Sequence, residues 1–463
     1  MSKLYIFGIG GTGSRVLRSF TMLMAAGVNL GMDEIVPIII DPDAANGDLT
    51  RTVALMNSYE KIHLGLNFPS GTANKFFKVG IKQSLQNYNL LINDTDTKSF
   101  RNFIGLPGMN KENKAMIEML FSKKNLESKM DVGFKGNPNI GSVVLNQIVS
   151  STDFISFANS FEQGDKIFIV SSIFGGTGAS GFPLLLKTLR TDKTIPNFAM
   201  INNSEIGAIT LLPYFQIKQD SESEIDSSTF ISKTKSALAY YENNVVRNNQ
   251  INALYYLADD TKNTYDNHAG GSSQGNDAHL MEFLSATAIV DFCHNNYMGN
   301  TVNKELGVNN INGDSAVSFQ NFDNSLIRML RFPLTQFTLM ANCITQKLSD
   351  FKTLDLCHSF PENYFMGIFV SDIKGFMIKY CEWLSEMKNN RRSLDLYNLE
   401  CGNKPFDVIT NGAVYKAKSI KRDYDLFYNR LNQFKNIKGN DENKLMEIFY
   451  LGTEKLIKEK FKF

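Results

Sequence analysis

Two glycine-rich turns, each directly after a run of hydrophobic residues, constrain the fold of this chain more than any other feature. The first run, residues 4–9, leads into Gly-Gly-Thr-Gly at 10–13, and the second, residues 166–174, leads into Gly-Gly-Thr-Gly at 175–178. A strand that ends at glycines and continues as a helix exposes backbone N–H groups at the positive end of that helix, an arrangement that binds phosphate. The two turns therefore predict one nucleotide held from two sides.

Neither turn identifies the nucleotide by itself. Glycines at 8, 10 and 13 match the dinucleotide-binding fingerprint, which many unrelated nucleotide-binding sheets share. The second turn is more specific, because Thr177 and Ser180 add hydroxyls that can donate to phosphate oxygens. The chain contains no Gly-x-x-x-x-Gly-Lys-Ser/Thr segment, which excludes a P-loop.

Strand-like hydrophobic runs alternate with amphipathic helical segments as far as about residue 300. This alternation predicts an α/β fold, with a mostly parallel sheet covered by helices on both faces. We expect one domain over 1–300, which ends in a long central helix at 276–298, and a mainly helical C-terminal region over 301–463 without an assigned role. Strands are expected at 35–40, 197–201, 206–215 and 253–257, and helices at 142–155, 326–348, 376–387 and 444–461.

The composition limits the kinds of partner that the protein is expected to bind. Lys and Arg number 48 against 47 Asp and Glu, so nothing indicates binding to nucleic acid or to a membrane surface. No apolar run approaches the roughly 18 residues that span a bilayer, and no signal peptide precedes the first strand, so we expect a cytoplasmic protein. The five cysteines show no Cys-x-x-Cys spacing, and neither a disulfide framework nor a zinc site is predicted.

Several loops, taken in order, resemble those of the tubulin/FtsZ superfamily. Residues 175–181 (GGTGASG) resemble its signature glycine loop, and residues 8–14 fall where that family has its first phosphate loop. The acidic loop at 41–46 follows the second strand, as in the family, and residues 133–141 (GFKGNPNIG) resemble the FtsZ loop that meets the terminal phosphate. Residues 211–215 correspond to the strand that ends near the ribose. Asn276 and Asp277 resemble the residues that contact the base at the start of the long helix.

The resemblance implies a divergent, prokaryotic tubulin-like protein that binds GTP or GDP, with Mg²⁺ as a possible companion of the phosphates. It assigns an acid of the 219–226 stretch to the ribose, Glu222 or Glu224, although a merely solvated loop explains either residue equally well. It assigns the base to Asn276 together with Asp259 or Asp260, while Asn276 could equally be a helix cap. The other implied contacts are Gly10, Gly11, Thr12, Asp41, Gly136, Asn137, Gly175, Gly176, Thr177, Gly178, Ala179 and Ser180.

The departures from the family bear on catalysis. Family members hydrolyse GTP in trans, with two acids in a loop that completes the site of the next subunit. The closest match here has Asp323 in the first acidic position and Leu326 in the second, so the resemblance implies slow or absent hydrolysis. Asp323 could instead be a helix N-cap. Head-to-tail self-association is expected, and the C-terminal helices could bind a further protein partner.

Two other classes remain open. The opening glycine turn, the Asp-Pro-Asp segment at 41–43 and Arg51 partly resemble ThiF/MoeB, ubiquitin-activating-type enzymes that adenylate a carboxyl terminus with ATP. That family offers no counterpart of the later glycine loops. A Rossmann dehydrogenase ranks third, because no catalytic His/Lys/Tyr set stands out. A nucleotide-dependent regulator that never polymerises is a further alternative to a filament.

Overall fold

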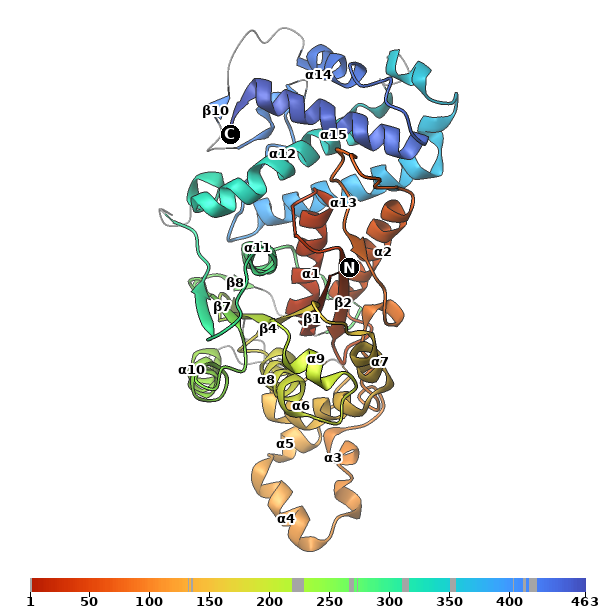
Figure 1. Cartoon of the computed structure of the whole chain (residues 1–463). Helices are drawn as coiled ribbons and strands as arrows, with labels where there is room; N and C mark the ends of the chain where they lie inside the picture. The colour runs from red at the N-terminus through yellow and green to blue at the C-terminus, as the bar shows by residue number, and fades with distance from the viewer. Residues whose placement is uncertain are drawn as a thin grey trace.

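The structure is a computed structural model of the 463-residue chain. It describes residues 2–463 except 132, 135, 219–228, 266–269, 273, 310–315, 350–354, 403, 411–413 and 416–422. Figure 1 shows a tall, layered molecule, with a sheet near its middle, helices above and below the sheet, and a small helical arm at one end.

The central sheet contains seven strands, all parallel to their neighbours, in the order β3-β2-β1-β4-β5-β7-β9. This arrangement confirms the predicted α/β class. The strands β1, β4 and β5 lie at its centre and are almost wholly buried, as expected of strands covered on both faces. The bounds are β1 Lys3–Ile9, β2 Glu34–Ile40, β3 Gly80–Ile81, β4 Lys166–Ser172, β5 Ile206–Leu211, β7 Ala253–Leu257 and β9 Val302–Glu305.

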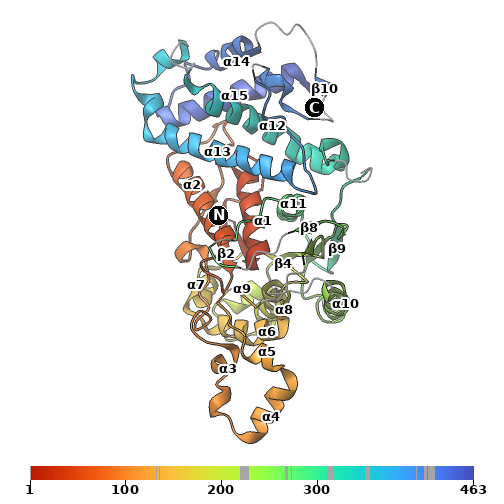
Figure 2. The same ribbon diagram turned by 180° about the vertical axis from the view of Figure 1, so that it is seen from behind.

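Helices cover both faces of the sheet, and Figures 1 and 2 show the two layers from opposite sides. One layer contains α1 (Gly10–Ala25), α2 (Gly47–Leu64) and α11 (Leu280–His294). The opposite layer contains α6 (Pro138–Leu145), α7 (Thr152–Ser160), α8 (Gly176–Thr191) and α9 (Phe198–Asn202), with α10 (Phe230–Tyr241) beside it. The N-terminal ends of α1 and α8 follow β1 and β4 directly, as the glycine turns predict.

The C-terminal region is helical, as predicted, and stacks on the α1 and α2 layer (Figures 1 and 2). The buried indole of Trp383 on α13 donates to Ser19 Oγ on α1 at 3.2 Å, and α13 also packs on α2. The shared core makes the two regions one packed body. The helices are α12 Asn324–Gln346, α13 Ile368–Asn389, α14 Asp423–Asn432 and α15 Asp441–Lys460.

Smaller elements complete the structure. The arm seen at the foot of Figure 1 contains α3 (Phe100–Phe103), α4 (Lys111–Leu120) and α5 (Lys123–Leu126). Two short two-stranded sheets pair β6 (Gln216–Ile217) with β8 (Thr264–Tyr265), and β10 (Val414–Tyr415) with β11 (Phe461–Lys462).

Three expected elements differ clearly from the structure, and the strand expected at 206–215 ends at Leu211. Residues 197–201 are not a strand: Asn197 has a left-handed φ of 52° and begins the short helix α9. The expected helix at 142–155 is divided into α6, a 3-10 turn and α7, with Ser151 capping the second helix through its side chain. The helix expected at 276–298 is shorter, because His279 caps α11. It leads into β9, which adds to the sheet beside β7. The domain boundary at residue 300 stays a prediction.

Candidate functional site

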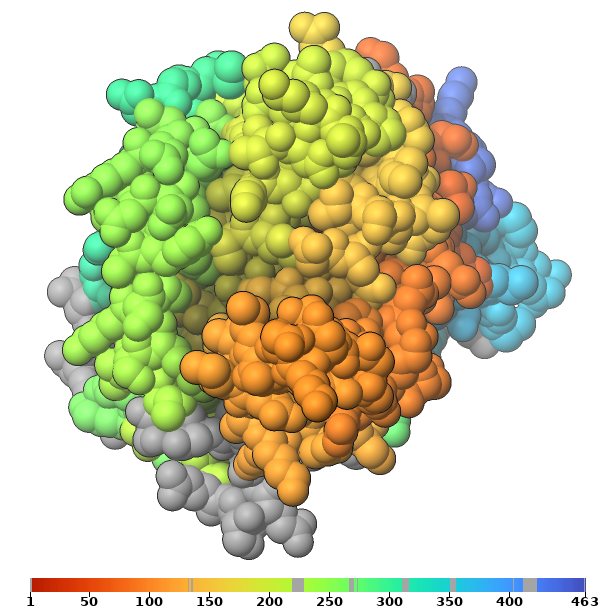
Figure 3. Space-filling view, turned by 90° about the horizontal axis from the view of Figure 1, so that it is seen from below, coloured from red at the N-terminus to blue at the C-terminus, as the bar shows by residue number. Residues whose placement is uncertain are grey.

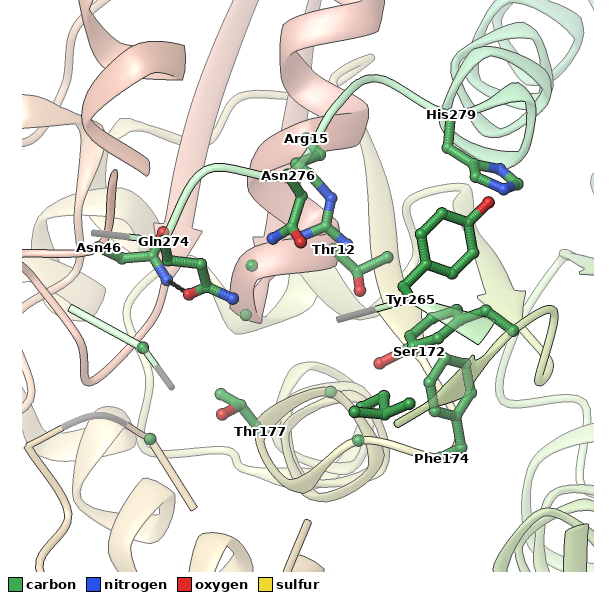
Figure 4. Close-up of a pocket in the computed structure, with 18 of the residues that line it drawn as sticks. Thr12, Arg15, Asn46, Ser172, Phe174, Thr177, Tyr265, Gln274, Asn276 and His279 are labelled. Carbon is green, nitrogen blue, oxygen red and sulfur yellow. Dashed lines mark hydrogen bonds between the residues drawn. The ribbon is translucent and has the colours of Figure 1, made fainter. Parts of the chain in front are cut away.

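The strand order reverses between β1 and β4, and this is where open α/β sheets bind ligands. From β1 the chain moves outward through β2 and β3, and from β4 it moves outward in the other direction. A cavity of about 710 Å³ lies at the carboxyl ends of these strands, within the size range of ligand sites. Figure 4 shows 18 of the residues that line it.

Glycine backbone forms the middle of the cavity. A Cβ atom on Gly10, whose φ is +70°, would lie 3.4 Å from Thr177 Cβ and 3.9 Å from Gly178 N, so the two turns nearly touch. A third segment, which contains Gly136, lies against the second turn. A Cβ on Gly176 would lie 3.1 Å from Gly136 N. The first backbone N–H groups of α1 and α8 have no partners within their own helices. The three glycine segments therefore provide a backbone surface suited to phosphate.

A polar end of the cavity lies beside the loop after β2. Asp43 N donates to Asp41 Oδ1 at 3.1 Å, and Gly271 N donates to Asp43 Oδ2 at 2.6 Å. Burial, reinforced by the charge of Asp43, raises the pKa of Asp41 to about 7. The side chains of Asn46 and Gln274 are hydrogen-bonded to each other across this end (Figure 4).

A buried ionic network forms the cavity wall between α1 and α11. Arg15 donates to Glu282 at 2.5 Å and to Asp48 at 3.1 Å. Asn276 donates to Asp48 through its backbone and its side chain, at 3.0 and 2.6 Å. Burial opposes the charge of Asp48, but Arg15, Asn276 and Arg51 together hold its pKa below the ordinary value. Burial raises the pKa of Glu282, although Arg15 opposes the shift.

The opposite end of the cavity is aromatic. Tyr214 and Phe174 pack edge to face at 6.1 Å between ring centroids, and Tyr214 lies 4.9 Å from the His279 ring. The Nδ1 atom of His279 accepts from Met281 N at 3.0 Å. Burial, with Arg15 and Arg392 nearby, lowers the pKa of His279 to about 3, so the ring is neutral. Planar walls and few charges suit a base or another flat group. The aromatic lining is Phe174, Tyr214, Phe215, Phe230 and Tyr265.

The last turn of α13 also lines the aromatic end, and the sequence offered no signal for it. Asn389, Asn390 and Arg391 lie along the cavity, and Tyr265 Oη donates to Asn390 Oδ1 at 2.6 Å. These residues follow the end of a helix far along the chain and match no binding motif. Only the docking of the C-terminal region brings them to the site.

Most of the residues predicted for the phosphates line the cavity. Ala179 and Ser180 instead line a separate groove of about 660 Å³ between α6, α8 and α10, visible from below in Figure 3. The Ser180 hydroxyl donates to Gly176 O within α8. Asn137 is the N-cap position of α6. The predicted residues that line the cavity are Gly10, Gly11, Thr12, Asp41, Gly136, Gly175, Gly176, Thr177, Gly178 and Asn276.

The other predicted residues lie elsewhere. Asp259 pairs with Arg392 at 2.8 Å and Asp260 with Lys262 at 2.6 Å, and neither lines the described cavity. Asp323 is the N-cap of α12, where its carboxylate accepts from Ser325 N and Leu326 N at 2.8 and 2.9 Å. Glu222 and Glu224 lie outside the described residues.

The described part of the chain contains no group of three or more His, Cys, Asp or Glu side chains placed to hold a metal ion by themselves. None of its described helices is long and apolar enough to cross a membrane.

No protein-family model matches the chain, and no curated protein matches it. Similar solved structures include CetZ2 from Haloferax volcanii, described as a GTPγS-bound protofilament, with 14% identity over 56% of this chain and 49% of that one, and a TM-score of 0.27. CetZ from Methanosaeta thermophila is 16% identical over 56% and 46%, with a TM-score of 0.25. CetZ1 from Haloferax volcanii, described as a GDP-bound monomer, is 15% identical over 55% and 51%, with a TM-score of 0.28.

The chain spans about half the length of these three structures. Because their TM-scores are all low, the likeness to these structures supports no conclusion about function.

Proposed function

We propose that this chain binds a guanine nucleotide, GTP or GDP, and that the bound nucleotide controls head-to-tail self-association. One observation carries the proposal: three glycine segments meet where the strand order reverses. A Cβ atom added to Gly10 would lie only 3.4 Å from Thr177 Cβ. The order of the loops, which resembles the tubulin/FtsZ superfamily, supports guanine over adenine.

The phosphates would lie along the glycine backbone, and the nucleoside would extend toward the aromatic end. Gly10, Gly11 and Thr12 would contact phosphate from α1, and Gly175 to Ser180 from the first turn of α8. Gly136 and Asn137 would approach the terminal phosphate. In this arrangement Gly175 to Gly178 carry the N–H groups that have no partner within α8, whereas Ala179 and Ser180 line the separate groove and would act by holding the first turn of the helix.

Recognition of the base would need further contacts besides those of the residues that the sequence suggested. The side-chain amide of Asn276 already donates to Asp48, and Asp259 already pairs with Arg392. The carbonyl oxygen of the Asn276 side chain still offers an acceptor for a base N–H, while Asp259 would have to leave its ion pair.

A Mg²⁺ ion would fit at the polar end of the cavity. Asp41 and Asp43 provide carboxylate oxygens beside the glycine turns, and Mg²⁺ is commonly held by one or two carboxylates with substrate phosphates and waters. When bound there, the ion would neutralise charge on the phosphate oxygens.

Assembly would place the acid of one subunit at the nucleotide of the next. A heterologous contact of this kind extends into a filament unless it closes into a ring. We propose Asp323 as the acid that acts in trans. With Leu326 in the second acidic position, one carboxylate would position the attacking water, so hydrolysis would be slow or absent. The C-terminal helices could bind a further partner.

Chromatography of the nucleotide released from purified protein tests the binding proposal. We expect GTP or GDP, and competition binding should favour GTP over ATP, because a mismatched base leaves buried donors and acceptors unpaired. Recovery of ATP would support an adenylating enzyme, and recovery of NAD a dehydrogenase. Absence of binding to all three would reject a nucleotide site.

Light scattering and phosphate release across a concentration series test the assembly proposal. Catalysis in trans should make phosphate release rise more than linearly with protein concentration, and the filaments should persist in GTP. Rapid release that is linear in protein concentration would place catalysis within one chain. A constant, small particle size in GTP would favour a regulator that does not polymerise.

A further inference from the structure

The C-terminal helical region contributes a wall to the cavity at its aromatic end. The helix α13 ends at Asn389, and the next two residues, Asn390 and Arg391, continue along the cavity. Tyr265 lies in contact with them, although it is 125 positions from Asn390 in the sequence. A ligand that fills this end would therefore touch both halves of the chain.

Hydrogen bonds hold this wall in place. Asn390 accepts from Tyr265 Oη at 2.6 Å through Oδ1 and donates to Ala278 O at 3.1 Å through Nδ2. One side chain thus links the turn after α13 to two segments of the α/β region. Next to it, Arg392 pairs with Asp259 at 2.8 Å. The turn after α13 is thereby tied to three segments of the α/β region, through Tyr265, Ala278 and Asp259.

Arg391 offers a cation at the rim of the aromatic end. Its guanidinium carbon lies 5.7 Å from the centroid of the Tyr265 ring, within the range of a cation–π contact. Among the described residues it forms no ion pair with a carboxylate. A planar guanidinium beside an aromatic wall can stack on a base or donate to ribose and carbonyl oxygens.

One turn earlier, Glu386 connects α13 to the wall of the cavity. Its carboxylate accepts from Ala278 N at 2.9 Å and binds Arg18 of α1 through both oxygens, at 2.7 and 3.0 Å. Ala278 lies between the cavity-lining residues Asp277 and His279. The segment that leads into α11 is therefore positioned by α13 as well as by the sheet.

We propose that the last turn of α13 is part of the ligand site, with Arg391 in contact with the nucleoside. This inference rests on the proposed nucleotide site and adds a regulatory consequence. Because the ligand contacts both regions, binding stabilises the docking of the C-terminal helices, and their docking strengthens binding to the same degree. A partner that pulls on α13 would release the nucleotide.

Binding measurements on Arg391→Ala test the contact. We expect GTP affinity to fall about tenfold, while inorganic tripolyphosphate, which lacks the nucleoside, binds as to the wild type. Lys388→Ala is the matched control, since Lys388 is exposed on the same turn and does not line the cavity. We expect it to bind GTP normally. Arg391→Lys keeps the charge but not the planar group, and should bind GTP with intermediate affinity.

Hydrogen exchange tests the coupling without a variant. GTP should slow amide exchange in peptides across α13, while α4 in the distant arm exchanges at its ligand-free rate. Equal GTP affinity of Arg391→Ala and the wild type, an equal loss for tripolyphosphate, or unchanged exchange in α13 would each overturn the inference and leave nucleotide binding intact. Failure of the wild type to bind GTP would instead overturn the proposed function itself.

Discussion

The two ends of the cavity are built in different ways. Around Gly10 and Gly176 the surface is backbone, contributed by turns that directly follow β1 and β4. At the aromatic end it is side chain, contributed by segments as far apart as Phe174 and Arg391. Backbone N–H groups can bind any phosphate, whereas side chains can distinguish one base from another. We therefore expect affinity for all nucleotides to depend on the first end and selectivity on the second.

We expect the largest effect on stability from a substitution of Arg15, which lines the cavity. Arg15→Met would leave Glu282 buried without its cation and Asp48 with Arg51 as its remaining cation, and should lower the free energy of unfolding by about 3–5 kcal/mol. Urea unfolding measures the change. Arg247→Met is the control, because that arginine pairs with Glu242 at an exposed site and should cost at most about 1 kcal/mol. Equal effects of the two variants would show that the network contributes little.

Gly11→Val tests the backbone end. A Cβ on Gly11 would meet only the Arg15 guanidinium, at 3.4 Å, so a side chain there enters the cavity without a backbone clash. We expect affinity for GTP, ATP and tripolyphosphate to fall together by about 100-fold, or about 2.7 kcal/mol.

Titration calorimetry measures the affinities of this variant. Gly375→Val, in an open position of α13, is the control and should bind normally. Gly178 is less suitable, because a Cβ there would meet Ser172 O at 2.6 Å and disturb β4 itself. Loss of GTP binding alone, with tripolyphosphate unaffected, would contradict the assignment of the phosphates to this end.

Asp41 should make stability depend on pH. Its pKa in the folded state, raised to about 7 by burial, exceeds the ordinary aspartate value of 3.8, so the folded state keeps a proton that the unfolded state releases. Stability should therefore fall as pH rises from about 4 to about 7, by up to about 1.4 kcal/mol per pH unit, and level off above.

Urea unfolding at several pH values, compared between the wild type and Asp41→Asn, isolates this contribution. The variant carries no titrating group at 41 and should have a flatter profile. Identical profiles would show that the pKa of Asp41 is the same in the folded and the unfolded states.

The smallest expected effect separates two roles of Asp323, which lies outside both ends of the cavity in its own chain. Asp323→Ala removes the N-cap of α12 and should destabilise the protein by about 1 kcal/mol, whereas Asp323→Asn keeps a capping oxygen and should not. If the carboxylate acts in trans, both variants should lose GTP hydrolysis while binding GTP normally. Retained hydrolysis in Asp323→Asn would leave the residue as a cap alone.

Much of the fold was predictable because its signals are local. The runs before Gly10 and Gly175 are mostly apolar and almost wholly buried, as expected of strands covered on both faces, and each glycine turn closely follows its strand. The same reasoning failed where local signals compete. Residues 197–201 are apolar enough for a strand, but the left-handed Asn197 turns the chain into a helix.

By itself, the sequence determined the class of fold, the mainly helical C-terminal region and the glycine surface, because neighbouring residues encode each of them through hydrogen bonding and periodicity. Only the tertiary structure decided which side chains complete the cavity. In the fold Asp259 is paired with Arg392 and so is not free to read a base, and Arg391 lines the site only because α13 docks there. Such contacts join segments more than a hundred residues apart. A local sequence pattern cannot predict that two such segments come together when the chain folds.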